Sequence, residues 1–149
     1  HLGFDHGEKS NGWVTAGAEV YDSRTKKWQQ IKEMPVAGPT SVVTIGKNEI
    51  YVIIHGASIY KYCPKCDELN LGPSGEYIKV APLPLKHWYC FDVCTYGRRI
   101  FFTGGSVHGR WSTAFFEFDT ASSEFLQRPP MMKERRRGSC SLVEVPKHA

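Results

Sequence analysis

The sequence contains no apolar stretch that approaches the length of a membrane-spanning helix, so we expect no membrane protein. It has five cysteines in 149 residues, an odd number at low density, which excludes a disulfide-stapled domain and favours a reducing, cytoplasmic compartment. No initiator methionine, signal peptide or transit pattern stands at the beginning, and we therefore expect these residues to be a fragment of a longer chain.

Recognisable catalytic arrangements are also missing. The glycine-containing stretches 72–75 and 103–109 lack the spacing and the strand-to-helix context of a phosphate-binding loop. No nucleophile stands at a suggestive spacing from a base, and the six histidines are scattered along the chain. We therefore expect a binding protein that is not an enzyme and that needs no cofactor.

One pattern has the spacing of a metal site. Cys63-Pro-Lys-Cys66 has the spacing of a zinc knuckle, and further potential ligands follow at His87, Cys90 and Cys94. In the architecture expected below, the later cysteines lie in the first strand of one sheet, whereas Cys63 lies at the far edge of the sheet before it. We therefore favour a turn with small buried cysteines over a zinc site.

Positively charged residues are only slightly in excess. The formal net charge is +4, and the main basic cluster is "KERRR" at 133–137. Short basic runs are usually solvated surface, so we do not expect nucleic acid as a partner.

The residues that are abundant point to strands. The hydrophobic share of 41% and the charged share of 23% are ordinary for a globular protein, but the aromatic share of 13% is high and 14 glycines accompany it. Aromatic residues and glycines at short intervals are typical of many short strands joined by turns.

Two stretches of the chain follow the same pattern. In residues 18–35 and in residues 113–131, an apolar run ends in an aromatic residue and an aspartate, and a second aromatic residue follows seven positions after the first. The first aromatic residues are Tyr21 and Phe118, which are 97 positions apart. This interval is about twice a unit of 48–49 residues, which predicts an internal repeat.

The middle unit lies halfway between these two. Tyr77 lies 49 residues after Trp28 and 48 residues before Phe125, and residues 43–56 match residues 94–105 in pattern. The middle unit departs from the other two in two ways. Cys63 takes the place of the aspartate, and eight additional residues separate its two aromatic positions, Tyr62 and Tyr77.

The apolar runs in each unit have the character of strands. Residues 40–46, 49–54, 98–103 and 114–118 are β-branched, aromatic and almost continuously apolar, and glycine, asparagine, aspartate or proline bounds them. Continuous apolarity predicts burial on both faces, and no run has helical spacing over a useful length. We therefore expect an all-β protein.

A repeat of about 50 residues with four short strands is the size of a β-propeller blade. Gly104 and Gly105 then mark the end of a second strand, where backbone passes close to backbone. The large side chain of Trp28, in a last strand, is expected to fill the gap between adjacent blades. A WD-repeat propeller is the close alternative, although its period is shorter and its Gly-His and Trp-Asp signature is missing.

The sequence resembles the Kelch repeat family. The resemblance is carried by "IFFTGG" at 100–105, "VYDSRTKKWQQIKEMP" at 20–35 and "EFDTASSEFLQRPPMMKER" at 117–135. It implies a Kelch-type β-propeller, with about three four-stranded blades of an incomplete ring. The implied units are repeat 1 at about 1–36, repeat 2 at about 37–86, repeat 3 at about 87–136 and the start of a further blade at 137–149.

The resemblance also implies a function in protein recognition. Kelch propellers bind partners through the loops that follow the paired glycines and the loops that join successive blades. Aromatic and arginine side chains are enriched at binding hot spots. The positive charge of the arginines would suit an acidic peptide. In this sequence the candidate partner-binding residues in those loops are His6, His87, His108, Arg110, Trp111 and Arg135.

The resemblance is greatest to proteins that join BTB and BACK domains to a Kelch propeller. It implies that the propeller recruits substrates to a cullin-RING ubiquitin ligase, with the cullin bound through domains that these 149 residues do not include. An actin-binding or scaffolding Kelch protein is the alternative, and a propeller-based metal oxidase is less favoured.

Overall fold

Short antiparallel strands make up all the regular secondary structure of the part of the chain that the computed structural model describes. The described residues are 2–3, 15–64, 75–135, 138–141 and 143. Within them there is no helix, and so none with the length and apolarity to cross a membrane. The prediction of an all-β protein is therefore confirmed.

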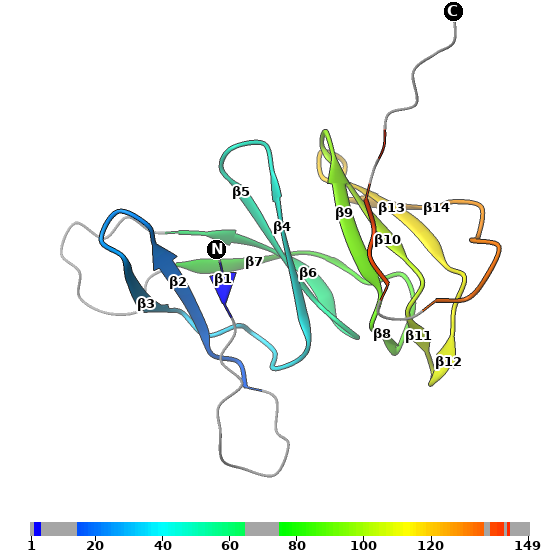
Figure 1. The fold of residues 1–149 in the computed structure, drawn as a ribbon, viewed down its shortest axis with the longest axis horizontal. Helices are drawn as coiled ribbons and strands as arrows, with labels where there is room; N and C mark the ends of the chain where they lie inside the picture. The colour runs from blue at the N-terminus through cyan, green and yellow to red at the C-terminus, as the bar shows by residue number, and fades with distance from the viewer. Residues whose placement is uncertain (1, 4–14, 65–74, 136–137, 142, 144–149) are drawn as a thin grey trace, which may run out of the picture.

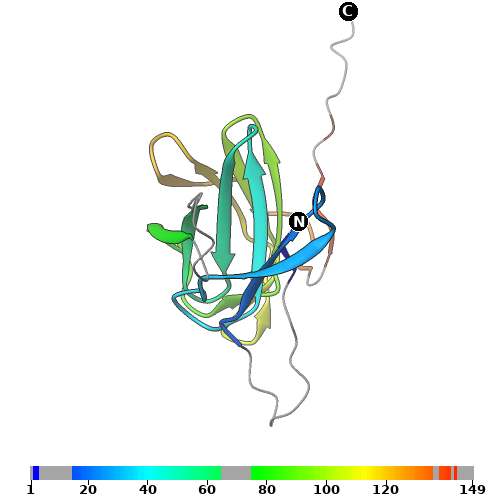
Figure 2. The ribbon, with the colours of Figure 1, turned by 90° about the vertical axis from the view of Figure 1, so that its left-hand side faces the viewer.

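The strands form three main sheets that lie side by side in chain order (Figure 1). The first sheet contains β1 (Leu2–Gly3), β2 (Ala18–Asp22) and β3 (Lys27–Ile31), which pair in that order. The turned view shows the same row from the side of the first sheet (Figure 2). The three sheets form an open row, and no closed ring is seen among the described residues.

The second sheet is a four-stranded meander. Its strands are β4 (Thr40–Ile45), β5 (Glu49–Ile54), β6 (Ser58–Cys63) and β7 (Glu76–Pro82), which pair in chain order. Its first turn contains Gly46 at a φ of 61°, a left-handed conformation that costs glycine little.

The third sheet repeats this meander with an insertion. It contains β9 (Asp92–Tyr96), β10 (Arg99–Thr103), β13 (Phe115–Asp119) and β14 (Glu124–Gln127), which also pair in chain order. The four runs predicted as strands correspond to β4, β5, β10 and β13 and are confirmed.

A fourth, smaller sheet lies at one end of the third sheet, built from residues that come before β9 and between β10 and β13 in the chain (Figure 1). It consists of β8 (Trp88–Tyr89), β11 (Ser106–Val107) and β12 (Arg110–Trp111), and we call it the loop sheet. The connections that contain His87, His108, Arg110 and Trp111 were expected to be loops, and the structure corrects this, because parts of them pair as these short strands. Because β11 pairs with both other strands, the insertion satisfies its backbone hydrogen bonds locally.

The inner strands of the second sheet, β5 and β6, are buried on both faces, as the continuous apolar run at 49–54 predicted. Along β5, Tyr51 and Ile53 pack toward the third sheet, while Val52 and Ile54 pack toward the first. Successive side chains of a strand point to opposite faces, so an unbroken apolar run suits a sheet between two others. An ion pair of 3.2 Å between Arg98 and Glu49 also joins the third sheet to the second.

The predicted repeat is visible in equivalent contacts. The amide of Met34 donates to the carbonyl of Ala16 at 2.8 Å, and the corresponding amide of Met131 donates to Thr113 at 2.9 Å. In the second sheet the amide of Leu83 makes the same kind of bond, to Ala57 at 3.2 Å. The three sheets therefore end in the same way.

The turns that follow Asp22 and Asp119 are also equivalent. Oδ1 of Asp22 accepts a hydrogen bond of 2.8 Å from the amide of Arg24, and Oδ1 of Asp119 accepts one of 2.7 Å from the amide of Ala121. These amides lower the pKa of both carboxyl groups because they stabilise the charged form. Four positions after each aspartate, directly before the next strand begins, Lys26 and Ser123 have positive φ, at 57° and 59°.

The aromatic pairs predicted from the repeat lie on neighbouring strands. Tyr21 is opposite Trp28 and Phe118 is opposite Phe125, with ring centroids 5.3 and 4.8 Å apart. Phe118 is fully buried against the second sheet, but Trp28 is 51% exposed, which corrects the prediction that it fills a gap between sheets. The aromatic pair of each sheet faces the sheet before it, and among the described residues no sheet precedes the first.

Candidate protein-interaction surface

The loop sheet is organised by a two-residue hairpin turn. Val107 and Arg110 are paired across β11 and β12, which leaves His108 and Gly109 as the turn. Both have positive φ, 48° and 79°, the combination that matches the twist of a tight hairpin. Histidine is one of the few non-glycine residues enriched in this conformation, so the local sequence allows the turn.

Two predicted partner-binding residues meet at this turn. The amide of His108 donates to the carbonyl of His87 at 3.3 Å, and the centroids of their imidazole rings are 4.8 Å apart. Both side chains are exposed. The positive φ of His87, 52°, turns the chain so that it can enter β8 beside the hairpin.

Trp88 anchors the loop sheet to the core. Its side chain is 0% exposed, and its indole Nε1 donates a hydrogen bond of 2.7 Å to the carbonyl of Gly104. The ring lies among Phe91, Phe102 and Phe116 of the core between the second and third sheets. Because Trp88 is fully buried, it holds the neighbouring surface in place and is not part of it.

Two more predicted residues, Arg110 and Trp111, form β12. Trp111 is 40% exposed and Arg110 is exposed. The hairpin continues to Ser112, whose carbonyl accepts a hydrogen bond of 3.3 Å from the amide of Arg135. The structure therefore brings Arg135 from the far end of the chain to the base of the hairpin.

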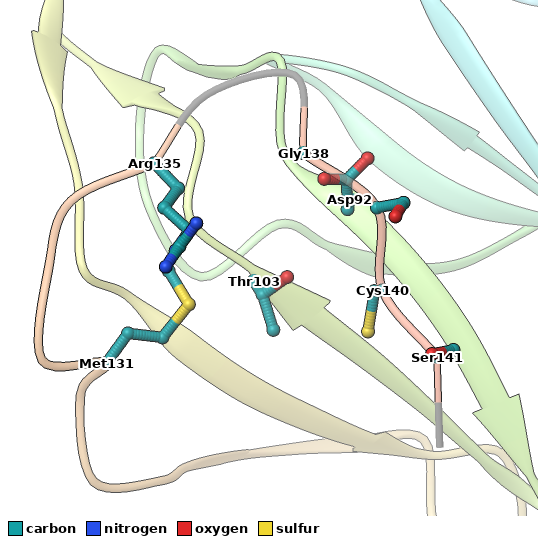
Figure 3. Close-up of a pocket in the computed structure, with 8 residues that line it drawn as sticks. Asp92, Thr103, Met131, Arg135, Gly138, Cys140 and Ser141 are labelled. Carbon is teal, nitrogen blue, oxygen red and sulfur yellow. The ribbon is translucent and has the colours of Figure 1, made fainter. Parts of the chain in front are cut away.

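Arg135 also borders a pocket of about 440 Å³ beside β9 and β10 (Figure 3). Arg135 and Met131 lie on one side of the pocket, Asp92 lies on the other, and Thr103 lies between them. Partial burial raises the pKa of Asp92. The whole lining is Asp92, Thr103, Met131, Arg135, Gly138, Ser139, Cys140 and Ser141.

The exposed edge of this region carries positive charge. Arg110 and Arg135 are exposed, and within the described residues neither guanidinium has an ion-pair partner. Other arginines of the third sheet are already engaged, since Arg99 and Arg128 both pair with the buried carboxylate of Glu117. Exposed arginines without an internal carboxylate are available to a ligand.

The remaining predicted site residues are placed differently. His6 and Cys66 lie outside the described residues. Cys63 ends β6, whereas Cys94 lies in β9 and its sulfur is 2.6 Å from that of Cys140. Among the side chains that the structure describes, no three His, Cys, Asp or Glu residues form a group that could hold a metal ion.

Sequence reasoning did not identify two residues that the structure makes prominent. His55 occupies the position of the first glycine of the pair in the middle unit, and its ring stacks on Phe91 with centroids 4.0 Å apart. The departure from Gly-Gly was the signal that could have pointed to it. Cys140 had no such signal, because only the fold brings it to Cys94.

Comparisons with known proteins add no identification. None of the known protein families has a model that matches this chain, and no curated protein matches it.

Proposed function

We propose that this chain is part of a Kelch-type β-propeller and recognises other proteins through the loop sheet together with Arg135. The observation that carries this proposal is the convergence of His87, His108, Arg110 and Trp111 on one small sheet next to Arg135. These residues come from three separate segments of the chain. A surface that combines exposed arginine and tryptophan has the composition of a binding hot spot.

The internal repeat supports the propeller part of the proposal. Sheets that end in equivalent hydrogen bonds and carry equivalent aromatic pairs are the expected product of a repeated blade. Rigid sheets of this kind hold binding loops at fixed positions.

The charge of the surface supports an acidic peptide as the ligand. Arg110 and Arg135 can each form a bidentate pair with a carboxylate, and Trp111 offers apolar area beside them. The pocket next to Arg135 is large enough to take one side chain of such a peptide. In the role we propose, the peptide belongs to a substrate that the protein presents to a cullin-RING ubiquitin ligase.

The test is affinity capture from cells with the full-length protein, followed by mass spectrometry. We expect a cullin and one or more additional proteins in the captured material. The additional proteins should be lost with the Arg110→Ala, Arg135→Ala double variant, whereas the cullin should remain. Capture of actin in place of a cullin would replace the adaptor role by an actin-binding role, and unchanged capture by the double variant would overturn the proposed surface.

A further inference from the structure

Two thiols face each other on the outer side of the third sheet. Cys94 is opposite Phe101 in the pairing of β9 with β10, while the neighbouring Ile100 and Phe102 are buried toward the second sheet. Because side chains alternate along a strand, Cys94 points away from that core. Residues 138–141 run along this side, and the sulfur of Cys140 lies 2.6 Å from the sulfur of Cys94.

We propose that Cys94 and Cys140 form a reversible disulfide that ties residues 138–141 to β9. Two thiols this close require little backbone movement to reach the bond length of about 2.05 Å. Both side chains are half-buried, so a small thiol reagent can reach them. The pair is also well separated in the chain, by 46 positions, so the bond would close a long loop.

The positions of the two sulfurs in the fold suggest different roles. Cys94 lies within β9, where burial and the hydrogen bond with Cys140 raise its pKa to about 12, whereas Cys140 lies on residues 138–141, outside any strand. We assign the first attack to the Cys140 thiolate because this segment lies on the outer side of the sheet, and the thiolate is the reactive form of cysteine. The oxidant that we name is a low-molecular-weight disulfide such as oxidised glutathione.

The exchange then takes place in two balanced steps. The Cys140 thiolate attacks one sulfur of oxidised glutathione, which forms a mixed disulfide and releases one glutathione thiolate. The Cys94 thiol gives its proton to that thiolate and attacks the Cys140 sulfur, which expels the second glutathione. The two protein thiols are oxidised, one glutathione disulfide is reduced to two thiols, and excess reduced glutathione reverses the reaction.

The bond would act on the pocket described above. Cys140 belongs to the wall formed by residues 138–141, opposite Arg135 and Met131 (Figure 3). When the disulfide is formed, that wall is fixed to β9; when it is reduced, the wall is held by weaker contacts. The redox state of this cysteine pair therefore sets how firmly one side of the pocket is held.

The experiment is peptide mapping without reduction, after equilibration of the protein with excess oxidised glutathione. Trypsin releases Cys94 in the peptide 87–98 and Cys140 in the peptide 138–147. We expect one cross-linked species of these two peptides, which disappears after treatment with reduced glutathione. The oxidised protein should also melt higher by roughly 5–10 °C, because the closed loop restricts the unfolded chain.

Peptide 87–98 also contains Cys90, so variants are needed to identify the partner. The Cys90→Ser variant serves as the control and should retain the cross-link and the rise in melting temperature. The Cys94→Ser and Cys140→Ser variants should lose both. A cross-link that persists in Cys94→Ser would overturn the proposal, and so would wild-type protein that carries only glutathione adducts and no cross-link. If a variant does not fold, fragmentation of the cross-linked wild-type peptides still shows whether Cys90 or Cys94 is bonded to Cys140.

Discussion

The amide of Gly105 donates a hydrogen bond of 2.8 Å to the carbonyl of Arg135, and this bond fixes the backbone of one arginine of the proposed surface. The same relationship occurs one sheet earlier, where the amide of Gly56 donates to the carbonyl of Trp88, also at 2.8 Å. In both places the glycine at the end of a second strand holds the segment that follows the sheet. The glycine at this position thus fixes the backbone of the segment that follows each sheet, which in the third sheet carries Arg135 of the proposed surface.

We predict that Gly105→Ala destabilises the protein far more than Gly109→Ala does. Both glycines have positive φ, 87° and 79°, so both substitutions carry the strain of a left-handed alanine, about 1–2 kcal/mol. Only at Gly105 would the new Cβ collide with backbone, at 2.6 Å from the carbonyl oxygen of Tyr89. We expect a total loss of about 2–4 kcal/mol in the free energy of unfolding at Gly105. Urea denaturation of both variants measures this difference, and equal losses would contradict the close approach.

Two aromatic residues of the repeat, Phe118 of the third sheet and Trp28 of the first, are expected to differ in their importance for stability. Phe118 is 0% exposed and Trp28 is 51% exposed, although each is paired with the aromatic residue opposite. Phe118→Ala should lower the free energy of unfolding by about 3–5 kcal/mol, because it opens a cavity between the second and third sheets. Trp28→Ala should cost about 1 kcal/mol, since much of the indole is already in contact with solvent. If chemical denaturation gave the reverse order, the packing of the sheets would be different from that described.

His55 makes the stability depend on pH. Its Nδ1 accepts a hydrogen bond of 3.1 Å from the amide of Cys90, and its Nε2 lies 2.9 Å from the hydroxyl of Ser41. Nδ1 can accept only when it carries no proton, so this arrangement requires a neutral ring. Burial lowers the pKa of His55 from 6.5 to about 4.

We therefore predict a loss of stability on acidification. Between pH 6.5 and pH 4 the unfolded chain binds a proton at His55 and the folded chain does not, so the free energy of unfolding falls as the pH falls. The full effect below pH 4 is on the order of 3 kcal/mol, and above pH 7 the group contributes no slope. Denaturation curves across this range should lose that component in His55→Gln and keep it in the control, His108→Gln. An unchanged pH profile in His55→Gln would show that another group is responsible.

The repeat was the part of the fold that could be predicted from the sequence. The spacing of Tyr21, Trp28, Phe118 and Phe125 predicted paired strands, and the structure places these residues directly opposite one another. Continuous apolar runs predicted burial on both faces, which β5 of the second sheet confirms. These features follow from local periodicity, and periodicity is visible in a sequence.

The loop sheet and the cysteine pair could not be predicted in the same way. Strands of two residues, such as β8 and β11, are too short to show a detectable pattern in the sequence. The contact between Cys94 and Cys140 depends on the path of the chain after the third sheet. Four of the six predicted binding residues nevertheless lie in or directly beside the loop sheet, because both of its segments were identified as connections between strands.

The most direct test of the account is the affinity of a captured partner for the Arg110→Ala, Arg135→Ala double variant. A variant with Lys27→Ala and Lys32→Ala removes the same charge from exposed positions on or next to the first sheet and serves as the control. Isothermal titration calorimetry should show that the double arginine variant binds about tenfold more weakly or worse, a loss of about 1.4 kcal/mol, with an unchanged melting temperature. The control should bind like the wild type. Wild-type affinity in the double arginine variant would contradict the claim that the loop sheet and Arg135 form the recognition surface.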